Sequence, residues 1–179
     1  MNRWSPRLFD TNYTLNLEEI QTLGEAFRWA PSSSNQQPWH VVFVSRENEL
    51  FQDLANQGLT GFNRAWAPSA SVLAVVLARK EEKGKERNQA ATFFDVGLAS
   101  MQMVLQAESM GLRSHFMGGI LHEPISQQLG AEDFWVVCVI AIGKQASIEG
   151  AAPELVEREL AVRSRFSAEH AYSINARLR

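Results

Sequence analysis

Small polar side chains fill a short segment between Pro31 and Pro38, directly before the apolar run at residues 41–44. Residues 30–39 read Ala-Pro-Ser-Ser-Ser-Asn-Gln-Gln-Pro-Trp. Each proline fixes φ and removes a backbone donor, so we expect a stiff loop. Hydroxyl and amide groups in a fixed frame suit a planar, polar heteroaromatic ligand better than a metal ion. Taken by composition alone, such a segment is more often an ordinary connection.

A second group of candidate binding residues lies near the N-terminus, where Arg3, Ser5 and Arg7 alternate with other residues. In an extended segment, residues two apart point to the same side. Guanidinium groups match phosphate oxygens, and the serine hydroxyl adds a third donor. The segment therefore has the chemistry of a phosphate site, although such a segment taken alone is more often a solvated basic terminus.

Other kinds of chemistry find little support in the sequence. The four histidines, His40, His115, His122 and His170, show neither an HExxH motif nor a spacing of four residues, so we expect no metal site. The chain also lacks a G-x-S-x-G motif. Cys138 is the only cysteine, so it can form no internal disulfide, which fits a reducing compartment.

Composition limits the class of protein further. The chain has 179 residues, of which 45% are hydrophobic, so we expect one folded domain over residues 1–179. With 17 basic and 20 acidic residues, its net charge of -3 favours neither nucleic acid nor an anionic membrane as partner. The first seven residues lack an apolar signal core, and no apolar run approaches the ~18 residues of a membrane span. We therefore expect a cytoplasmic protein with a small-molecule partner.

Short apolar runs and helical periodicity predict the elements that position these residues. Buried strands are expected at residues 39–44, 72–78 and 134–142, with another short strand at 112–117. Helices are expected at residues 17–29, 90–110 and 151–160. Their expected boundaries are marked by Asn16, Gly111 and Pro153. The residues after 160 show no clear period, so this tail needs a surface on which to lie.

Five segments together resemble the nitroreductase family of FMN-dependent NAD(P)H oxidoreductases. They are the N-terminal Arg-x-Ser-x-Arg followed by Phe-Asp, the Pro-Ser loop, Asn63, the Met117-Gly118-Gly119 turn, and Arg163-Ser164-Arg165. The resemblance implies an α+β protein with a nitroreductase-like three-layer α/β/α fold. Its mixed, mostly antiparallel central sheet is flanked by helices, and its C-terminal extension packs on the partner subunit of a homodimer.

The resemblance also implies a role for each matching residue. Arg3 and Ser5, completed by Arg163 and Arg165, would hold the FMN phosphate, whereas Arg7 would lie near flavin N1 and O2. The backbone of Gly118 or Gly119 would face flavin N5, so these glycines and Arg7 are the expected catalytic groups. The remaining expected cofactor contacts are Pro31, Ser32, Ser33, Asn35, Gln37, Asn63 and Met117.

By the same resemblance, the protein would pass hydride from NADH or NADPH through FMN N5 to a nitroaromatic, quinone or related planar acceptor in a ping-pong reaction. Two other functions stay open. One is a nitroreductase-like flavin protein of another activity, of the flavin destructase type. The other is a non-catalytic dimeric binding or regulatory module.

Two departures from the family pattern leave the substrate cover open. Gly118 stands where many relatives carry an acidic residue. The connection at residues 79–88 is shorter than in many relatives, and its charges predict a solvated turn rather than a binding patch. The physiological acceptor and the choice between NADH and NADPH stay undetermined at this point.

Overall fold

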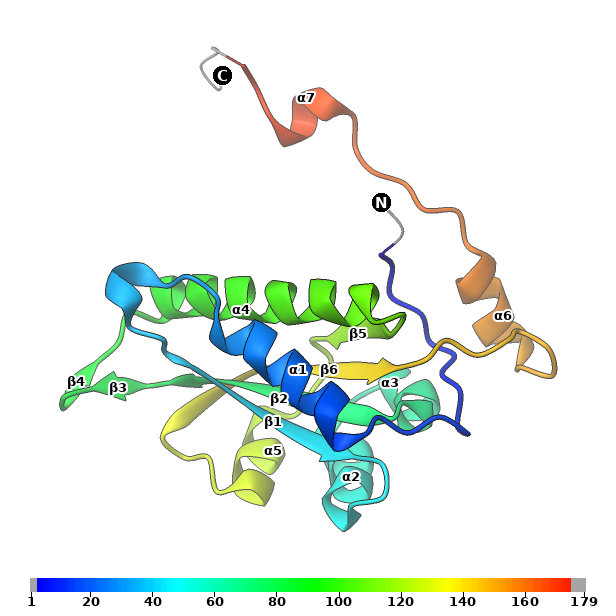
Figure 1. Ribbon diagram of the computed structural model, residues 1–179, viewed down its shortest axis with the longest axis horizontal. Coiled ribbons are helices and arrows are strands. Elements are labelled where there is room, and N and C mark those ends of the chain that lie inside the picture. The colour runs from blue at the N-terminus through cyan, green and yellow to red at the C-terminus, as the bar shows by residue number, and fades with distance from the viewer. Residues whose placement is uncertain (1–2, 175–179) are drawn as a thin grey trace.

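The computed structural model describes residues 3–174, and a four-stranded sheet forms its centre (Figure 1). The strands are β1 (Trp39–Ser45), β2 (Val72–Arg79), β5 (Arg113–Met117) and β6 (Phe134–Gly143), in the order β1-β2-β6-β5. All three pairings are antiparallel, in agreement with the mostly antiparallel sheet expected. The four predicted strands are confirmed, with bounds that differ by one residue at most.

Strand β2 is apolar up to its last residue, Arg79, because helices cover both faces of the sheet. Every residue from Val72 to Ala78 is buried, and none of these side chains is polar. An antiparallel strand with one face in water alternates between apolar and polar residues, whereas a strand covered on both faces does not. The continuous apolar run in the sequence therefore reports a three-layer arrangement.

One face of the sheet is covered by α1 (Leu17–Arg28) and α4 (Gln89–Ser109). Helix α1 begins at a capping box, in which the Asn16 side chain accepts from the Glu19 N–H and Glu19 bonds back to Asn16. Leu23 and Phe27 of α1 share a buried cluster with Val96 and Met103 of α4 and with the strands. Both predicted helices are confirmed.

The other face is covered by short segments that the sequence did not predict. They are α2 (Glu49–Asp53), η2 (Leu54–Gly58), α3 (Asn63–Trp66), η3 (Ala67–Ser69) and α5 (His122–Leu129). Phe51, Leu54, Trp66 and Ile125 from these segments are fully buried against the sheet. The two apolar clusters on opposite faces complete the three layers and confirm the predicted fold class.

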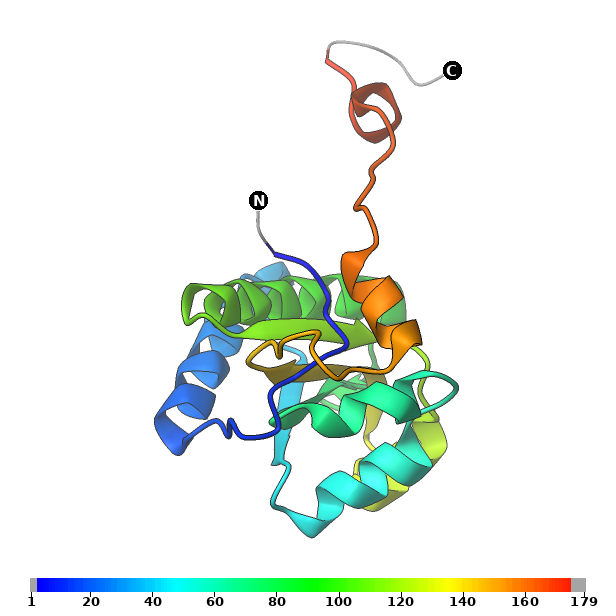
Figure 2. The same ribbon diagram turned by 90° about the vertical axis from the view of Figure 1, so that its right-hand side faces the viewer.

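Small elements lie outside the layers. They are the turn η1 (Ser33–Asn35), the hairpin of β3 (Glu81–Glu82) and β4 (Lys85–Glu86), and the C-terminal helices α6 (Pro153–Leu160) and α7 (Ala168–Ala171). After α6 the chain leaves the body of the molecule, as both views show (Figures 1 and 2). Every described residue from 160 onward is exposed, including Val162, Phe166 and Ile174. No helix in the described part of the chain is long and apolar enough to cross a membrane.

Candidate functional site

Unusual backbone geometry marks the Pro-Ser loop. Ser34, Asn35 and Gln37 have φ values of 49°, 55° and 46°, in the left-handed region that favours glycine. A non-glycine residue in this region costs free energy unless its surroundings hold it there. Three such residues within four positions indicate that the fold imposes the shape of this loop.

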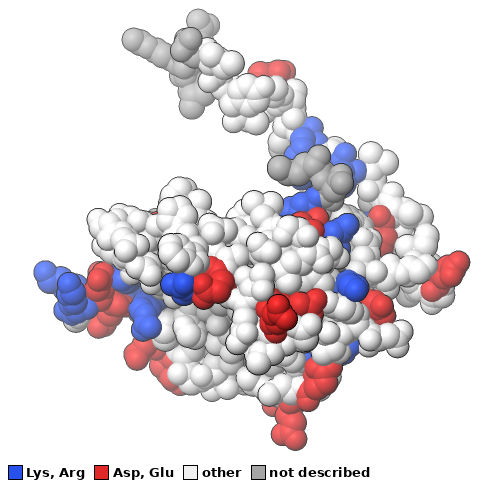
Figure 3. Space-filling model, viewed as in Figure 1, with Lys and Arg blue, Asp and Glu red and all other residues white. Residues whose placement is uncertain are grey.

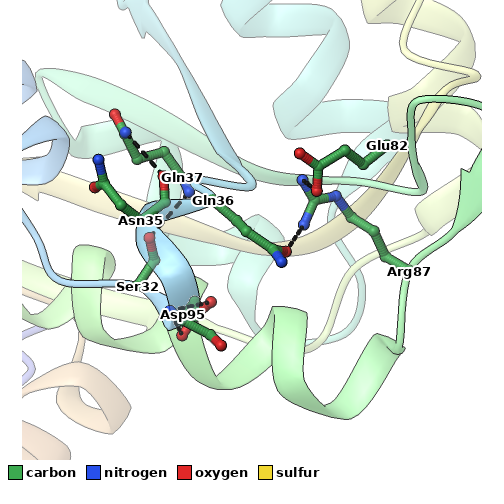
Figure 4. A network of polar contacts seen from close by, with 8 residues as sticks. Ser32, Asn35, Gln36, Gln37, Glu82, Arg87 and Asp95 are labelled. Carbon is green, nitrogen blue, oxygen red and sulfur yellow. Dashed lines mark hydrogen bonds and ion pairs between the residues drawn. The ribbon is translucent and has the colours of Figure 1, made fainter.

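A small set of hydrogen bonds holds the loop in this shape (Figure 4). The Ser32 hydroxyl accepts from the Gln37 N–H at 2.9 Å, and the Gln37 side-chain amide donates to the Asn35 carbonyl at 3.1 Å. The buried carboxylate of Asp95 in α4 accepts from the Ser33 N–H, with oxygens at 3.2 and 3.3 Å. Each of these bonds joins one side chain to a backbone group, and residues 33–37 remain exposed.

The N-terminal segment is held on the sheet at the other end of the molecule. Its backbone pairs with the chain after β6, through Asp10 N–H to the Lys144 carbonyl at 2.9 Å and Ala146 N–H to the Leu8 carbonyl at 3.1 Å. Phe9 is buried and stacks on Trp66 at a centroid distance of 6.2 Å. This anchoring fixes the backbone from which the preceding basic side chains extend.

Arg3, Ser5 and Arg7 are half-buried and form one polar group. Arg3 Nη1 donates to Ser5 Oγ at 3.3 Å, and the Arg7 N–H donates to a Glu159 carboxylate oxygen at 2.5 Å. Burial and the neighbouring Arg158 lower the pKa of Arg7, although Glu159 opposes the change. An arginine remains charged at neutral pH even when its pKa is lowered. A bound anion would therefore offset the free-energy cost of burying this positive charge.

His115 of β5 lies beneath this segment. Its Nδ1 lies 2.8 Å from the Pro6 carbonyl oxygen, and because a carbonyl only accepts, Nδ1 carries the proton and donates it. The centroid of its ring lies 4.4 Å from that of Trp66. Burial is the largest cause that lowers the pKa of His115, so the neutral form is favoured. The histidine thus ties the N-terminal segment to β5 without adding a charge.

Two glycines follow β5 and lie next to Asn63. The Gly119 carbonyl accepts from the Thr60 N–H at 3.0 Å and from the Asn63 amide at 3.2 Å. A Cβ on Gly119 would lie 3.0 Å from both side chains, whereas a Cβ on Gly118 would meet nothing within 4 Å. The exposed backbone of Gly118 is therefore free to approach a ligand, and a side chain also fits there. Met117 is buried in the core, so only its backbone could take part.

The structure brings some of the predicted site residues together and separates others. Trp66 stacks on Phe9 and contacts the tilted ring of His115, so it joins the N-terminal segment, α3 with Asn63, and β5 with its two glycines. The Pro-Ser loop instead sits at the start of α4, while β5 begins beyond the end of that helix (Figure 1). The axis of α4 from Asp95 to Ser109 is about 21 Å long at 1.5 Å per residue. The predicted contacts therefore form two groups within one chain, one near each end of α4.

Comparison with known proteins identifies the family of this chain. The model of the Nitroreductase family matches residues 1–144. The chain belongs to the nitroreductase family. A solved structure described as an oxidoreductase containing FMN shares 33% identity and a TM-score of 0.80, covering 92% of this chain and 89% of that chain. An enone reductase structure, CLA-ER, shares the fold with a TM-score of 0.78 at 22% identity, covering 98% of this chain and 95% of that chain.

Curated members of the nitroreductase family are also similar. The Oxygen-insensitive NADPH nitroreductase of Helicobacter acinonychis is 32% identical over 145 residues, covering 79% of this chain. The match spans only 62% of that relative's length. FMN reductase (NADPH) of Bacillus subtilis is 29% identical over 169 residues, covering 87% of this chain and 68% of the relative.

The late basic pair of this nitroreductase-family chain lies in its C-terminal tail. Arg163 and Arg165 are exposed, and Arg165 Nη1 donates to the Ser164 carbonyl at 2.6 Å. The tail extends beyond the body, so the predicted meeting of these arginines with Arg3 and Ser5 stays a prediction (Figure 2).

Two residues that hold the loop were not predicted as part of the site. Asp95 lies in the predicted helix at residues 90–110 and was not among the predicted site residues, and its carboxylate accepts from the Ser33 N–H. The prediction of a solvated turn at residues 79–88 is wrong for Arg87, whose side chain is only 7% exposed and donates to Gln36 at 2.6 Å. An acidic residue on the buried side of a helix was the available signal for Asp95, because a buried carboxylate needs donors. The sequence holds no comparable signal for Arg87.

Proposed function

We propose that this chain binds FMN and is an NAD(P)H-dependent oxidoreductase that reduces quinones, nitroaromatics or related planar acceptors. The observation that carries the proposal is the pair of preformed polar groups. One offers two guanidinium groups and a hydroxyl, which suit a phosphate, and the other offers exposed hydroxyls and amides in an imposed shape. The names of the relatives, which include FMN and NADPH, support the same chemistry.

FMN, when bound, would supply the electron-transfer chemistry at N5, and the protein would supply position and charge. Arg7 would stabilise negative charge at flavin N1 and O2. The backbone of Gly118 or Gly119 is exposed and would donate an N–H toward N5. Cys138 is no rival nucleophile, because burial raises its pKa to about 12.

We infer further that the working form is a homodimer. Phe94, Met101 and Leu105 are 68%, 36% and 47% exposed. Their spacing of seven and four residues places them along one side of α4. An exposed apolar stripe on a central helix, next to a C-terminal tail without a surface beneath it, favours a second copy of the chain as the cover. A stable interface of this kind buries more than ~2,000 Å².

Dimerisation would also resolve the separation of the two polar groups. Neither group alone offers both phosphate donors and a loop for the flavin ring. In a two-fold dimer, the start of α4 in one subunit can lie near the end of α4 in its partner. Each flavin would then lie between the loop of one subunit and the N-terminal arginines of the other.

The acceptor range is expected to be broad. The space beside Gly118 is open, and the connection between β2 and α4 forms only a short hairpin. Steady-state assays with NADPH and a panel of quinones and nitroaromatics should show several acceptors reduced within about two orders of magnitude, because a stacking surface discriminates by only about 1 to 3 kcal/mol.

Absorbance of the purified protein is recorded in the same experiment. Flavin bands that persist through turnover support the proposed reductase. One acceptor favoured at least about a thousandfold would show a specific substrate site and contradict the broad range. Loss of the flavin bands in air with reductant would favour the destructase-type activity instead.

A further inference from the structure

A cavity of about 600 Å³ lies between the β3–β4 hairpin, the Pro-Ser loop and the start of α4. Ser33 and Gln36 of the loop form one wall, and the hairpin forms another. The volume lies within the range of small-molecule sites. Because Ser33 belongs both to this wall and to the predicted flavin contacts, the cavity adjoins the proposed flavin position. Its other lining residues belong to the hairpin and to the start of α4.

The hairpin is short and closes through a tight turn. Lys83 and Gly84 have φ values of 52° and 73°, and Glu82 pairs directly with Lys85. Two consecutive positive φ values are typical of a type I′ turn, which matches the twist of its strands. Glu82 and Lys85 are directly opposite residues of the two strands, so their side chains lie on the same face of the hairpin. The turn therefore fixes the backbone positions from which the Lys83 and Lys85 side chains extend.

Arg87 links the hairpin to the loop and faces the cavity (Figure 4). Its Nη1 donates to Gln36 at 2.6 Å, and its Nη2 lies 2.8 Å from the Glu82 carboxylate. The side chain is more than nine-tenths buried, yet its Nε has no hydrogen-bond partner. Because this Nε is enclosed and the other two nitrogens are engaged, Arg87 holds the hairpin to the loop and leaves ligand contacts to the exposed side chains nearby.

The cavity is lined by three cationic side chains, those of Lys83, Lys85 and Arg87, and by three carboxylates, those of Glu82, Glu86 and Asp95. Among the carboxylates, Glu82 is bound to Arg87 and Asp95 to the Ser33 N–H, which leaves Glu86. Lys83 and Lys85 are exposed and take part in no ion pair in the described part of the chain. Lys, Arg, Asp and Glu side chains gather at the hairpin end of the molecule in Figure 3.

We propose that this cavity binds the 2′-phosphate end of NADPH through Lys83 and Lys85, so that the protein selects NADPH over NADH. The inference rests on the proposed function, because the nicotinamide ring must reach a flavin beside Ser33. The adenosine end then extends along the loop toward the hairpin. A compact ammonium group on a flexible stem suits a phosphate that arrives from solvent.

The test compares the Lys83→Gln/Lys85→Gln double variant with the parent protein. We expect the ratio of the KM values for NADPH and NADH to rise about tenfold, with kcat at saturating NADPH preserved, since tenfold corresponds to about 1.4 kcal/mol. Added salt should reduce this preference in the parent, because the lysines are exposed. Calorimetry with 2′,5′-ADP and 5′-AMP gives a readout without turnover, and only the 2′,5′-ADP affinity should fall.

Lys80→Gln is the matched control. Lys80 precedes the hairpin and donates to the Glu132 carbonyl at 2.6 Å, outside the cavity. It should leave the KM ratio as in the parent. A ratio that changes less than about threefold in the double variant, while FMN stays bound and NADPH still reduces it, overturns this inference alone. A parent protein that binds no FMN would instead defeat the proposed function.

Discussion

Replacing Phe94 and Leu105 with glutamate is expected to convert the protein from a dimer to a monomer and to weaken FMN binding at least about a hundredfold. Both side chains lie on the exposed apolar side of α4, so the fold of one chain tolerates the change. At a subunit interface, two buried carboxylates without partners cost several kcal/mol, and about 2.7 kcal/mol already corresponds to a hundredfold. Sedimentation velocity and flavin fluorescence titration measure the two effects.

Leu17→Glu is the control for this double variant. Leu17 is also exposed, but it lies at the first position of α1, away from the apolar side of α4. A glutamate there adds a favourable charge at a helix N-terminus. The control should remain dimeric with full FMN occupancy. A monomeric Phe94→Glu/Leu105→Glu protein that still holds one FMN per chain would refute the dependence of the site on the dimer.

Removing either of two arginines should weaken FMN binding by about ten- to a hundredfold. Arg3→Ala and Arg165→Ala each delete a charge-assisted contact to phosphate, for which about 1.5 to 3 kcal/mol is expected. Riboflavin has no phosphate, so its affinity should change little in either variant. Fluorescence titration with FMN and riboflavin separates loss of the phosphate site from general damage.

Arg28→Ala serves as the control, because Arg28 pairs with Glu25 on the exposed side of α1. It should bind FMN as the parent does. Equal losses for FMN and riboflavin, or full retention of FMN by both arginine variants after dialysis, would show that the phosphate lies elsewhere.

The sequence predicted those parts of the fold that have a long, continuous pattern. The apolar run at 72–78 and the helical period of residues 90–110 each report burial over several turns or a whole strand. The segments α2, η2 and α3 have five residues or fewer, so no period could develop within them. Their positions depend on Phe51 and Trp66 packing against the sheet, which is tertiary information.

The candidate site was predictable by residue type but not by arrangement. The Pro-Ser loop and the N-terminal arginines stand out by composition and spacing. The left-handed backbone of Ser34, Asn35 and Gln37 could not be predicted, because local preference opposes it and Asp95 lies 62 residues after its partner Ser33. The burial of Arg87 depends likewise on Gln36, which is distant in sequence.

The composite nature of the site is the central claim, and a mixed dimer tests it most directly. One variant carries Arg3→Ala and Ser5→Ala, and the other carries Ser33→Ala and Asn35→Ala. Each alone should lose FMN. Co-expressed with different tags, they form a heterodimer in which one site has both of its parts intact and the other has both altered.

The measurement is the number of FMN molecules per purified heterodimer, from flavin and protein absorbance. We expect one FMN per heterodimer, half of the parent value, because the intact loop of one chain meets the intact arginines of the other. A heterodimer without FMN, formed from variants whose parent binds FMN fully, would show that each site is built within a single chain and would contradict this account.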